Sequence, residues 1–434
     1  MSKRTQGWIL AAPASNSGKT LVAAALLRLM ARKGMSITPF KVGPDYIDPG
    51  FLSNAADKTC FNLDPWAMNS ARIEHLLCNQ SGTHFLIEGV MGLFDGAVSG
   101  DGSTADLATA LNLPVVMVIN AKGQGASVAA LAQGFINHRK DVHVAGVIFT
   151  HIGSDRHKKI VSDACDKSQI RVFGYLKSDP ALSLRERHLG LVQASESDDL
   201  EQLLDRAADS LGESLNFLDF LELATSPSLN SKSTVSPIPP LGQNIAVAHD
   251  IAFGFCYPHV LEDWKASGAQ ISFFSPLANE APALDSDAVY LPGGYPELHA
   301  TALAANNTFL QGLRDAANRD AVILGECGGY MVLGQGVEDA DGNRHAMAGL
   351  LELETSFAKR KLHLGYRKVE LQTGCCLGET GTKFRAHEFH YTSILREEGN
   401  NLFTVSDALG ENKEHAGLVS GKIMGSFIHL IDRS

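Results

Sequence analysis

Short apolar runs alternate with helical patterns along much of the chain, and this alternation limits the possible folds more than any other feature. A strand that is apolar on both faces is typical of a parallel sheet covered by helices. In the first 220 residues the apolar runs fall at 7–13, 83–90, 113–120 and 142–150. After the first run, residues 19–34 have the spacing of an amphipathic helix that ends at Gly34.

One segment, residues 226–242, interrupts the alternation and is rich in Ser and Pro, as linkers are. The pattern then restarts, with apolar runs at residues 244–250, 269–276, 288–294 and 321–329. A length of 434 residues accommodates two or three domains. We therefore expect two α/β domains, residues 1–225 and 243–434, joined by a linker at 226–242.

The composition excludes several classes of protein. A net charge of -11 argues against general nucleic-acid binding. No apolar run is long enough to span a bilayer, so no membrane partner is expected. Residues 1–14 combine basic residues with an apolar stretch, as a signal peptide does, but this stretch is too short, and we interpret it as a first strand.

The seven cysteines indicate neither a disulfide framework nor a zinc cluster. Their spacings are irregular, no CxxC occurs, and the only adjacent pair is Cys375 and Cys376. Free thiols in a protein of this size favour a reducing compartment, and we expect a cytoplasmic location.

The stretch APASNSGKT, residues 12–20, lies between a predicted strand and a predicted helix. Backbone N–H groups in such a loop bind phosphates, the lysine reaches the outer phosphates, and the final hydroxyl can bind Mg²⁺. The first glycine of the usual pattern is replaced by Pro13. The residues predicted to bind a nucleotide such as ATP are Ser15, Asn16, Ser17, Gly18, Lys19 and Thr20.

Acidic residues follow at the ends of the next predicted strands, where open α/β sheets bind ligands. Asp45 and Asp48 lie just past a predicted second strand, and Glu88 ends an apolar one. Because Mg²⁺ prefers oxygen ligands, we expect Thr20, Asp48 and Glu88 to hold it. Taken one at a time, such acids are more often caps or turn residues.

The second candidate site is GECGGYMVLG, residues 325–334, which follows an apolar run. A strand-to-helix turn flanked by glycines is the architecture of a nucleophile elbow, which predicts that Cys327 is a nucleophile. A helix N-terminus there would lower the thiol pKa. The N–H groups of Gly294 and Gly328 are candidates for an oxyanion hole, and His429 for the base. The alternative is a buried, inert thiol.

Several motifs together resemble known families. GGYPE, GECGGYMVLG and GSFIHL resemble the class I glutamine amidotransferase domain. The whole chain resembles the family of cobyrinate or hydrogenobyrinate a,c-diamide synthases of cobalamin biosynthesis, whose N-terminal domain is similar to dethiobiotin synthetase. The further motifs that carry this resemblance are APASNSGKT, KVGPDYIDPGFL, NLDPWAM, EGVMGLFDG and RERHLGL.

The resemblance implies a ligase with two half-reactions. ATP with Mg²⁺ would phosphorylate the a and c acetate groups of a corrin polycarboxylate, and ammonia would displace the phosphate. Cys327 and His429 would release that ammonia from L-glutamine, and it would travel by a sheltered path between the domains. Lys41, Asp45 and Asp48 would lie near the substrate.

Basic and aromatic side chains offer further substrate contacts, although charged runs are usually solvated and a lone Trp is usually in the core. These candidates are Arg185, Arg187, His188, Lys359, Arg360, Lys361, Arg367 and Trp66.

The chain departs from the family patterns at a few positions. Ile431 stands where class I amidotransferases usually carry the third triad residue, a Glu, and Glu388 is a conceivable replacement, although a structural role is favoured for it. Asn16 replaces a glycine, which is tolerable because Asn accepts positive φ. Thr150 replaces an Asn that lies near the adenine in relatives, which puts base recognition in doubt.

Alternatives remain open. Nickel-sirohydrochlorin a,c-diamide synthases share these motifs, whereas the intact Gly18-Lys19-Thr20 argues against cobyric acid synthase. Cobalt-containing and cobalt-free corrins cannot be distinguished from any residue, and general similarity favours the cobalt-free one. A non-catalytic P-loop ATPase scaffold would lack the cysteine elbow, and a stand-alone glutaminase would lack the N-terminal half. A homodimer is possible.

Overall fold

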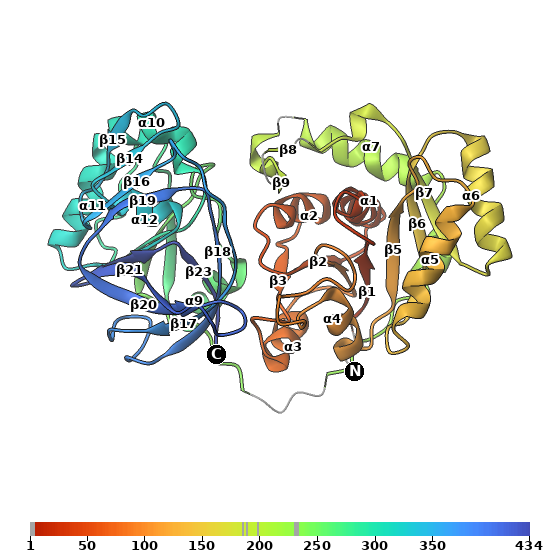
Figure 1. Ribbon diagram of the computed structural model, residues 1–434, viewed down its shortest axis with the longest axis horizontal. Coiled ribbons are helices and arrows are strands. Elements are labelled where there is room, and N and C mark those ends of the chain that lie inside the picture. The colour runs from red at the N-terminus through yellow and green to blue at the C-terminus, as the bar shows by residue number, and fades with distance from the viewer. Residues whose placement is uncertain (1–4, 185, 188–189, 198, 230–233) are drawn as a thin grey trace. The chain divides into compact units, whose positions relative to one another are not determined.

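The computed structural model describes residues 5–184, 186–187, 190–197, 199–229 and 234–434, without the side chains of 185–191. The chain divides into two compact units, Met1–Val235 and Ser236–Ser434, and each has an α/β fold (Figure 1). Arg185, His188 and the side chain of Arg187 lie outside this description. In the part that is described, no helix has both the length and the apolar character needed to cross a membrane.

The first unit is built on a parallel sheet, as the apolar runs predict. Its strand order, in the described residues, is β3-β2-β4-β1-β5-β6-β7. The strands are β1 (Gln6–Ala11), β2 (Ile37–Val42), β3 (Phe61–Leu63), β4 (His84–Glu88), β5 (Val115–Asn120), β6 (Val144–Ile152) and β7 (Val172–Lys177). Both faces of the strands are buried, since almost every residue of β1, β2 and β5 is inaccessible. This explains why the runs show no polar face.

Helices connect these strands and cover the sheet. They are α1 (Lys19–Arg32), α2 (Asp48–Ala56), α3 (Ser70–Cys78), α4 (Thr104–Leu111), α5 (Ser127–His138), α6 (Asp155–Lys167), α7 (Leu200–Gly212) and α8 (Phe217–Leu221). α1, α2 and α7 share one hydrophobic core over one face, and α5 and α6 lie on the other (Figure 1). α1 ends at Arg32, and Gly34 follows with φ 73°, close to the predicted end. The short strands β8 (Glu186–Arg187) and β9 (Gly190–Leu191) pair with each other.

The second unit contains a larger, mixed sheet. Its order is β11-β10-β12-β13-β22-β21-β20-β17-β18-β23, parallel from β11 to β22 and antiparallel from β22 onward. The parallel strands are β10 (Asn244–Ala248), β11 (Gln270–Phe274), β12 (Ala288–Leu291), β13 (Val322–Glu326) and β22 (Ile423–Ser426). The others are β17 (His363–Leu371), β18 (Lys383–His390), β20 (Asn400–Ser406), β21 (Glu414–Ser420) and β23 (Ile428–Arg433).

The strand–helix alternation holds in only the first half of this unit. Its helices are α9 (Pro258–Ala266), α10 (Ala300–Ala305), α11 (Asn307–Asn318) and α12 (Gly328–Leu333), and every regular element after α12 is a strand. A small sheet adds β14 (Gly336–Glu338), β15 (Arg344–Ala346), β16 (Leu353–Ser356) and β19 (Ser393–Glu397). The long antiparallel pairing of β18 with β23 places His387 opposite His429.

Two candidate active sites

The predicted phosphate loop lies between β1 and α1. Asn16 has φ 61° and Gly18 has φ 80°. Asn16 thus adopts the left-handed backbone that we expect an Asn to accept at this position. The Ser17 hydroxyl donates to the Ala14 carbonyl at 2.8 Å, and the Thr150 hydroxyl donates to the Ser17 carbonyl at 2.8 Å. Thr150 therefore supports the loop backbone from β6.

The charged residues predicted around this loop gather at the carboxyl ends of β2 and β4. Lys41 Nζ lies 2.5 Å from Asp48 Oδ2, 3.2 Å from Glu88 Oε1 and 3.9 Å from Asp45 Oδ2. Thr20 Oγ1 lies 2.7 Å from Glu88 Oε1 and 3.2 Å from Asp48 Oδ2. Strands that are separate in sequence thus bring their ends to the start of α1, as an open parallel sheet does.

The two acids at positions 45 and 48 differ in their surroundings. Asp45 Oδ1 accepts the backbone N–H groups of Ile47 and Asp48, so it holds the turn that leads into α2. Asp48 points toward Lys41 and Thr20 instead. Burial alone would raise the pKa of Asp48, but Lys41 holds it below its ordinary value.

The pKa values of the two lysines near the loop, Lys41 and Lys19, shift in opposite directions. Burial alone would lower the pKa of Lys41, but the charges of Asp48, Glu88 and Asp45 raise it above its ordinary value. Burial and then the charge of Lys41 lower the pKa of Lys19 to about 8. Lys19 Nζ donates to the Met91 carbonyl at 3.2 Å. Lys41 is thus a fixed cation inside an acidic cluster.

The donor set at this site fits a magnesium ion. Glu88 is fully buried, its Oε2 has no hydrogen-bond partner among the residues that the structure describes, and its Oε1 is shared with Thr20 and Lys41. A buried carboxylate oxygen without a partner is costly unless a cation or water satisfies it. Thr20, Asp48 and Glu88 offer oxygen atoms only, which Mg²⁺ prefers.

The second site is centred on the turn between β13 and α12. Cys327 has φ 48° and ψ -101°, an unusual conformation for a residue with a side chain, and it immediately precedes α12. The predicted sharp turn is therefore present. Cys327 is only 3% exposed, and its Sγ lies 3.6 Å from the Phe389 carbonyl oxygen of β18.

Gly293 lies close to both Cys327 and His429. A Cβ placed on Gly293 would lie 2.4 Å from His429 Cε1 and 3.4 Å from Cys327 Cβ. The proposed oxyanion glycines are also adjacent, because a Cβ on Gly328 would lie 3.2 Å from the Gly294 nitrogen. The predicted nucleophile, the predicted base and the two candidate N–H groups thus lie close together. Their closeness leaves no room for a side chain at Gly293.

The prediction of a lowered thiol pKa is wrong for this structure. Burial, followed by the negative charge of Glu297, raises the pKa of Cys327, and the Gly328 N–H opposes this only in part. Burial, followed by the charge of His387, lowers the pKa of His429 to about 3. Both groups are therefore neutral at pH 7. A base must remove the thiol proton for Cys327 to react.

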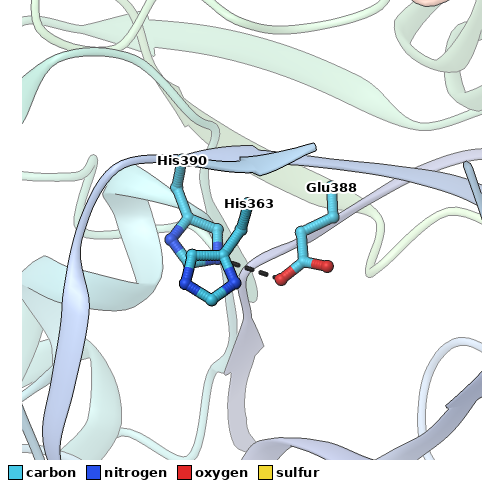
Figure 2. Close-up of side chains that lie close together, drawn as sticks. All are labelled: His363, Glu388 and His390. Carbon is cyan, nitrogen blue, oxygen red and sulfur yellow. Dashed lines mark hydrogen bonds and ion pairs between the residues drawn. The ribbon is translucent and has the colours of Figure 1, made fainter. Parts of the chain in front are cut away.

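Glu388, a conceivable orienter of His429, is engaged by other residues (Figure 2). Its Oε2 lies 2.6 Å from an Arg367 guanidinium nitrogen. Its Oε1 lies 3.0 Å from His390 Nε2, the contact that Figure 2 draws. The His390 ring stacks on His363, with centroids 4.5 Å apart and planes 5° apart, and also on Phe427. This arrangement favours a structural role for Glu388 in joining β17 to β18.

His363, Glu388 and His390 lie close enough together to suggest a metal site, but their geometry does not favour one. Their potential ligand atoms are within 4.8 Å of one another. The lone pairs of an imidazole lie in its ring plane, and the planes of these stacked rings are nearly parallel, so the lone pairs do not converge on one point (Figure 2). Both oxygens of Glu388 are also already paired.

The other residues suggested as substrate contacts are paired, exposed or in the core. Arg367 is paired with Glu388, and Lys359, Arg360 and Lys361 are exposed. Trp66 is 7% exposed and lies in the core of the first unit.

One residue of the second site was not predicted. Glu326, the last residue of β13, is 5% exposed, and its Oε2 lies 4.0 Å from His429 Nδ1. The sequence signal was an acid at the carboxyl end of a buried strand, directly before the cysteine.

Comparisons with models of known protein families show the class of protein to which the chain belongs. Residues 8–192 match the model of a CobQ/CobB/MinD/ParA nucleotide binding domain. Residues 244–434 match the model of a CobB/CobQ-like glutamine amidotransferase domain. The chain therefore joins a nucleotide-binding domain to a glutamine amidotransferase domain.

Relatives along the whole chain define the family. The chain is 51% identical to a hydrogenobyrinate a,c-diamide synthase of Brucella anthropi, over 98% of each protein. It is 49% identical to that of Rhizobium meliloti, over 99% of each, and 45% identical to that of Rhodobacter capsulatus, over 99% of this chain and 100% of the relative. The chain belongs to the hydrogenobyrinate a,c-diamide synthase family, and it is an enzyme, an amidating ligase with a glutamine amidotransferase domain.

Proposed function

We propose that the chain converts the a and c acetate carboxylates of hydrogenobyrinate into amides, using ATP and L-glutamine, as a cytoplasmic step of cobalamin biosynthesis. The observation that carries this proposal is the presence of both sites in one chain, the Thr20–Lys41–Glu88 cluster beside the phosphate loop and Cys327 beside His429. The substrate is inferred from the names of relatives 45–51% identical to the chain.

The first half-reaction activates a carboxylate at the phosphate loop. A carboxylate oxygen of the corrin attacks the γ-phosphorus of ATP, ADP leaves, and an acyl phosphate forms. Lys19 and the loop N–H groups stabilise the charge on the transferring phosphoryl group. Lys41 is a cation even in this buried cluster, and its pairing with Asp45 and Asp48 supports a role for it in holding the substrate carboxylate.

Thr20, Asp48 and Glu88 would hold Mg²⁺ at this site. The ion would supply positive charge that neutralises phosphate oxygens during the transfer.

The second half-reaction releases ammonia from glutamine. His429 takes the proton of Cys327, and the thiolate sulfur attacks the amide carbon. The N–H groups of Gly294 and Gly328 stabilise the oxyanion. The C–N bond breaks as His429 returns the proton to the leaving nitrogen, and water then hydrolyses the thioester to glutamate.

The two half-reactions join at the acyl phosphate. Ammonia, kept unprotonated, attacks the acyl carbon, phosphate leaves, and the amide forms. Because the substrate has two reacting acetates, one full conversion consumes two ATP and two glutamine molecules.

The test is a substrate comparison by mass spectrometry. Purified protein is incubated with ATP, Mg²⁺ and glutamine, together with hydrogenobyrinic acid, cobyrinic acid or nickel-sirohydrochlorin in separate reactions. We expect two successive acid-to-amide mass changes with hydrogenobyrinic acid. Conversion of only the cobalt or nickel compound would correct the substrate. No conversion of any of them, even with ammonium in place of glutamine, would overturn the proposal.

A further inference from the structure

We propose that Glu326 is the positioning residue for His429 in the glutamine half-reaction, and that it replaces the Glu that class I amidotransferases carry where this chain has Ile431. This inference deepens the proposed function and rests on its glutamine half-reaction.

Glu326 is held rigidly between two neighbouring elements. The Tyr290 hydroxyl of β12 donates to Glu326 Oε2 at 2.8 Å, and the Leu430 N–H of β23 donates to Oε1 at 3.2 Å. Both bonds are buried, so neither is weakened by competition with bulk water. The carboxylate therefore has one orientation, and its Oε2 faces Nδ1 of His429 at 4.0 Å.

The bond to Leu430 acts on His429 through the backbone. Leu430 directly follows His429, so Oε1 fixes the strand at the residue next to the base while Oε2 faces the base itself. Glu326 and Cys327 are also consecutive, so one turn sets the positions of the nucleophile and the carboxylate together. A small rotation of the His429 ring would bring Nδ1 within hydrogen-bond distance of Oε2 and leave Nε2 for proton exchange with the thiol.

The chemistry requires such a carboxylate. When His429 accepts the thiol proton, it becomes an imidazolium in a fully buried position, and an unpaired buried charge is costly. Ile431 offers no polar group, and both oxygens of Glu388 are paired with Arg367 and His390. Glu326 has an oxygen directed at the imidazole, so it can pair with the cation as it forms.

The same surroundings make the effect depend on pH. Burial raises the pKa of Glu326 to about 7, while the Tyr290 hydroxyl and the Leu430 N–H oppose the shift. The titratable groups that face it are Tyr290, Cys256, Cys327 and His429, and burial raises the pKa of the first three. The charged carboxylate therefore forms as the pH rises through about 7. Glutamine hydrolysis should rise over the same interval.

The test uses Glu326→Gln in the full chain, which keeps the size and the hydrogen-bonding capacity of the side chain but removes its charge. Glutamate release is measured from about pH 5 to about pH 9, roughly two pH units on either side of the Glu326 pKa of about 7. We expect kcat to fall roughly 10- to 100-fold, the KM for glutamine to change less than about twofold, and the rise near neutral pH to disappear. Glu370→Gln, at a half-exposed position of β17, is the matched control.

A second readout does not depend on turnover. The rate at which iodoacetamide alkylates Cys327, followed by peptide mass spectrometry, reports how readily the thiolate–imidazolium pair forms. We expect slower alkylation of Glu326→Gln than of wild type above pH 7. If wild type releases no glutamate but the variant is still alkylated more slowly, the proposed function fails and the positioning role stands. Equal alkylation rates with equal pH profiles would overturn the positioning role.

Discussion

The two candidate sites handle charge in opposite ways. Near the phosphate loop, Asp45, Asp48 and Glu88 surround Lys41, so three acids share one buried cation. At the second site, Cys327 and His429 are buried and both are neutral. The first site is thus already prepared for ionic ligands, whereas the second keeps its nucleophile unreactive until a proton moves.

The comparison also shows where each site places its backbone strain. Both sites lie on turns from a strand to a helix that contain a residue with positive φ. In the loop the strained positions are Asn16 and Gly18, which tolerate this conformation and expose N–H groups. In the second site the strained residue is Cys327 itself, the proposed nucleophile.

The largest effect expected from breaking the charge cluster comes from Glu88→Gln. Removing this buried charge would weaken the proposed Mg²⁺ site and take a counter-charge from Lys41, so we expect corrin amidation to fall about 100-fold or more. The loss should be equal with glutamine and with ammonium as nitrogen donor. Glutamate release by the variant serves as the folding control, and a loss with glutamine alone would contradict this assignment.

The converse change at the second site is Gly293→Ala. The new methyl group would lie 2.4 Å from His429 Cε1, so the base must shift. A displacement of this kind is expected to cost about 10- to 100-fold in glutamine-dependent amidation, and the ammonium-dependent rate should be unchanged. Parallel assays with the two donors check this. Unchanged glutamine use would show that His429 is not the base.

A smaller effect concerns protons taken up on ATP binding. Because burial and Lys41 lower the pKa of Lys19 to about 8, Lys19 is largely neutral at pH 9 in the free protein. Phosphates favour its charged form, so ATP binding at this pH should take up protons and weaken severalfold relative to pH 7. Calorimetry in two buffers of different ionisation enthalpy measures the uptake. Lys19→Arg, which stays charged, should remove it, and uptake that persists in this variant would point to another group.

The smallest expected effect is that of Thr150→Val. This substitution keeps the shape but removes the hydrogen bond to the Ser17 carbonyl, which should cost about 1 kcal/mol of unfolding free energy and weaken ATP binding severalfold. Thermal unfolding with and without nucleotide checks both effects, with Thr301→Val at an exposed position of α10 as the control. If the variant keeps full stability but changes its preference among nucleotide bases, Thr150 lies near the adenine instead.

Much of the fold and of both sites could be predicted because it depends on local patterns. Continuous apolar runs predicted β1, β4, β5 and β6 of the first sheet and β10, β11, β12 and β13 of the second, and Asn16 was expected to accept the positive φ that it adopts. Cys327 and His429 could be paired because family motifs mark both of them, even though about a hundred residues separate them.

What could not be predicted depends on contacts between distant segments. The raised pKa of Cys327 follows from burial beneath β18 and from the charge of Glu297, and neither can be recognised in the glycine-flanked motif. Thr150 supports the phosphate loop only because β6 ends beside it. The antiparallel half of the second sheet could not be predicted from apolar runs, because half-buried strands lack continuous runs of this kind.

The most direct test of the division into two sites is the nitrogen donor used by Cys327→Ala. Corrin amidation is measured by mass spectrometry with glutamine and, separately, with ammonium at high pH, using wild type and this variant. We predict that the variant loses glutamine-dependent amidation by about 1000-fold or more and keeps the ammonium-dependent rate of wild type. Retained use of glutamine would make Cys327 a structural thiol and contradict the account.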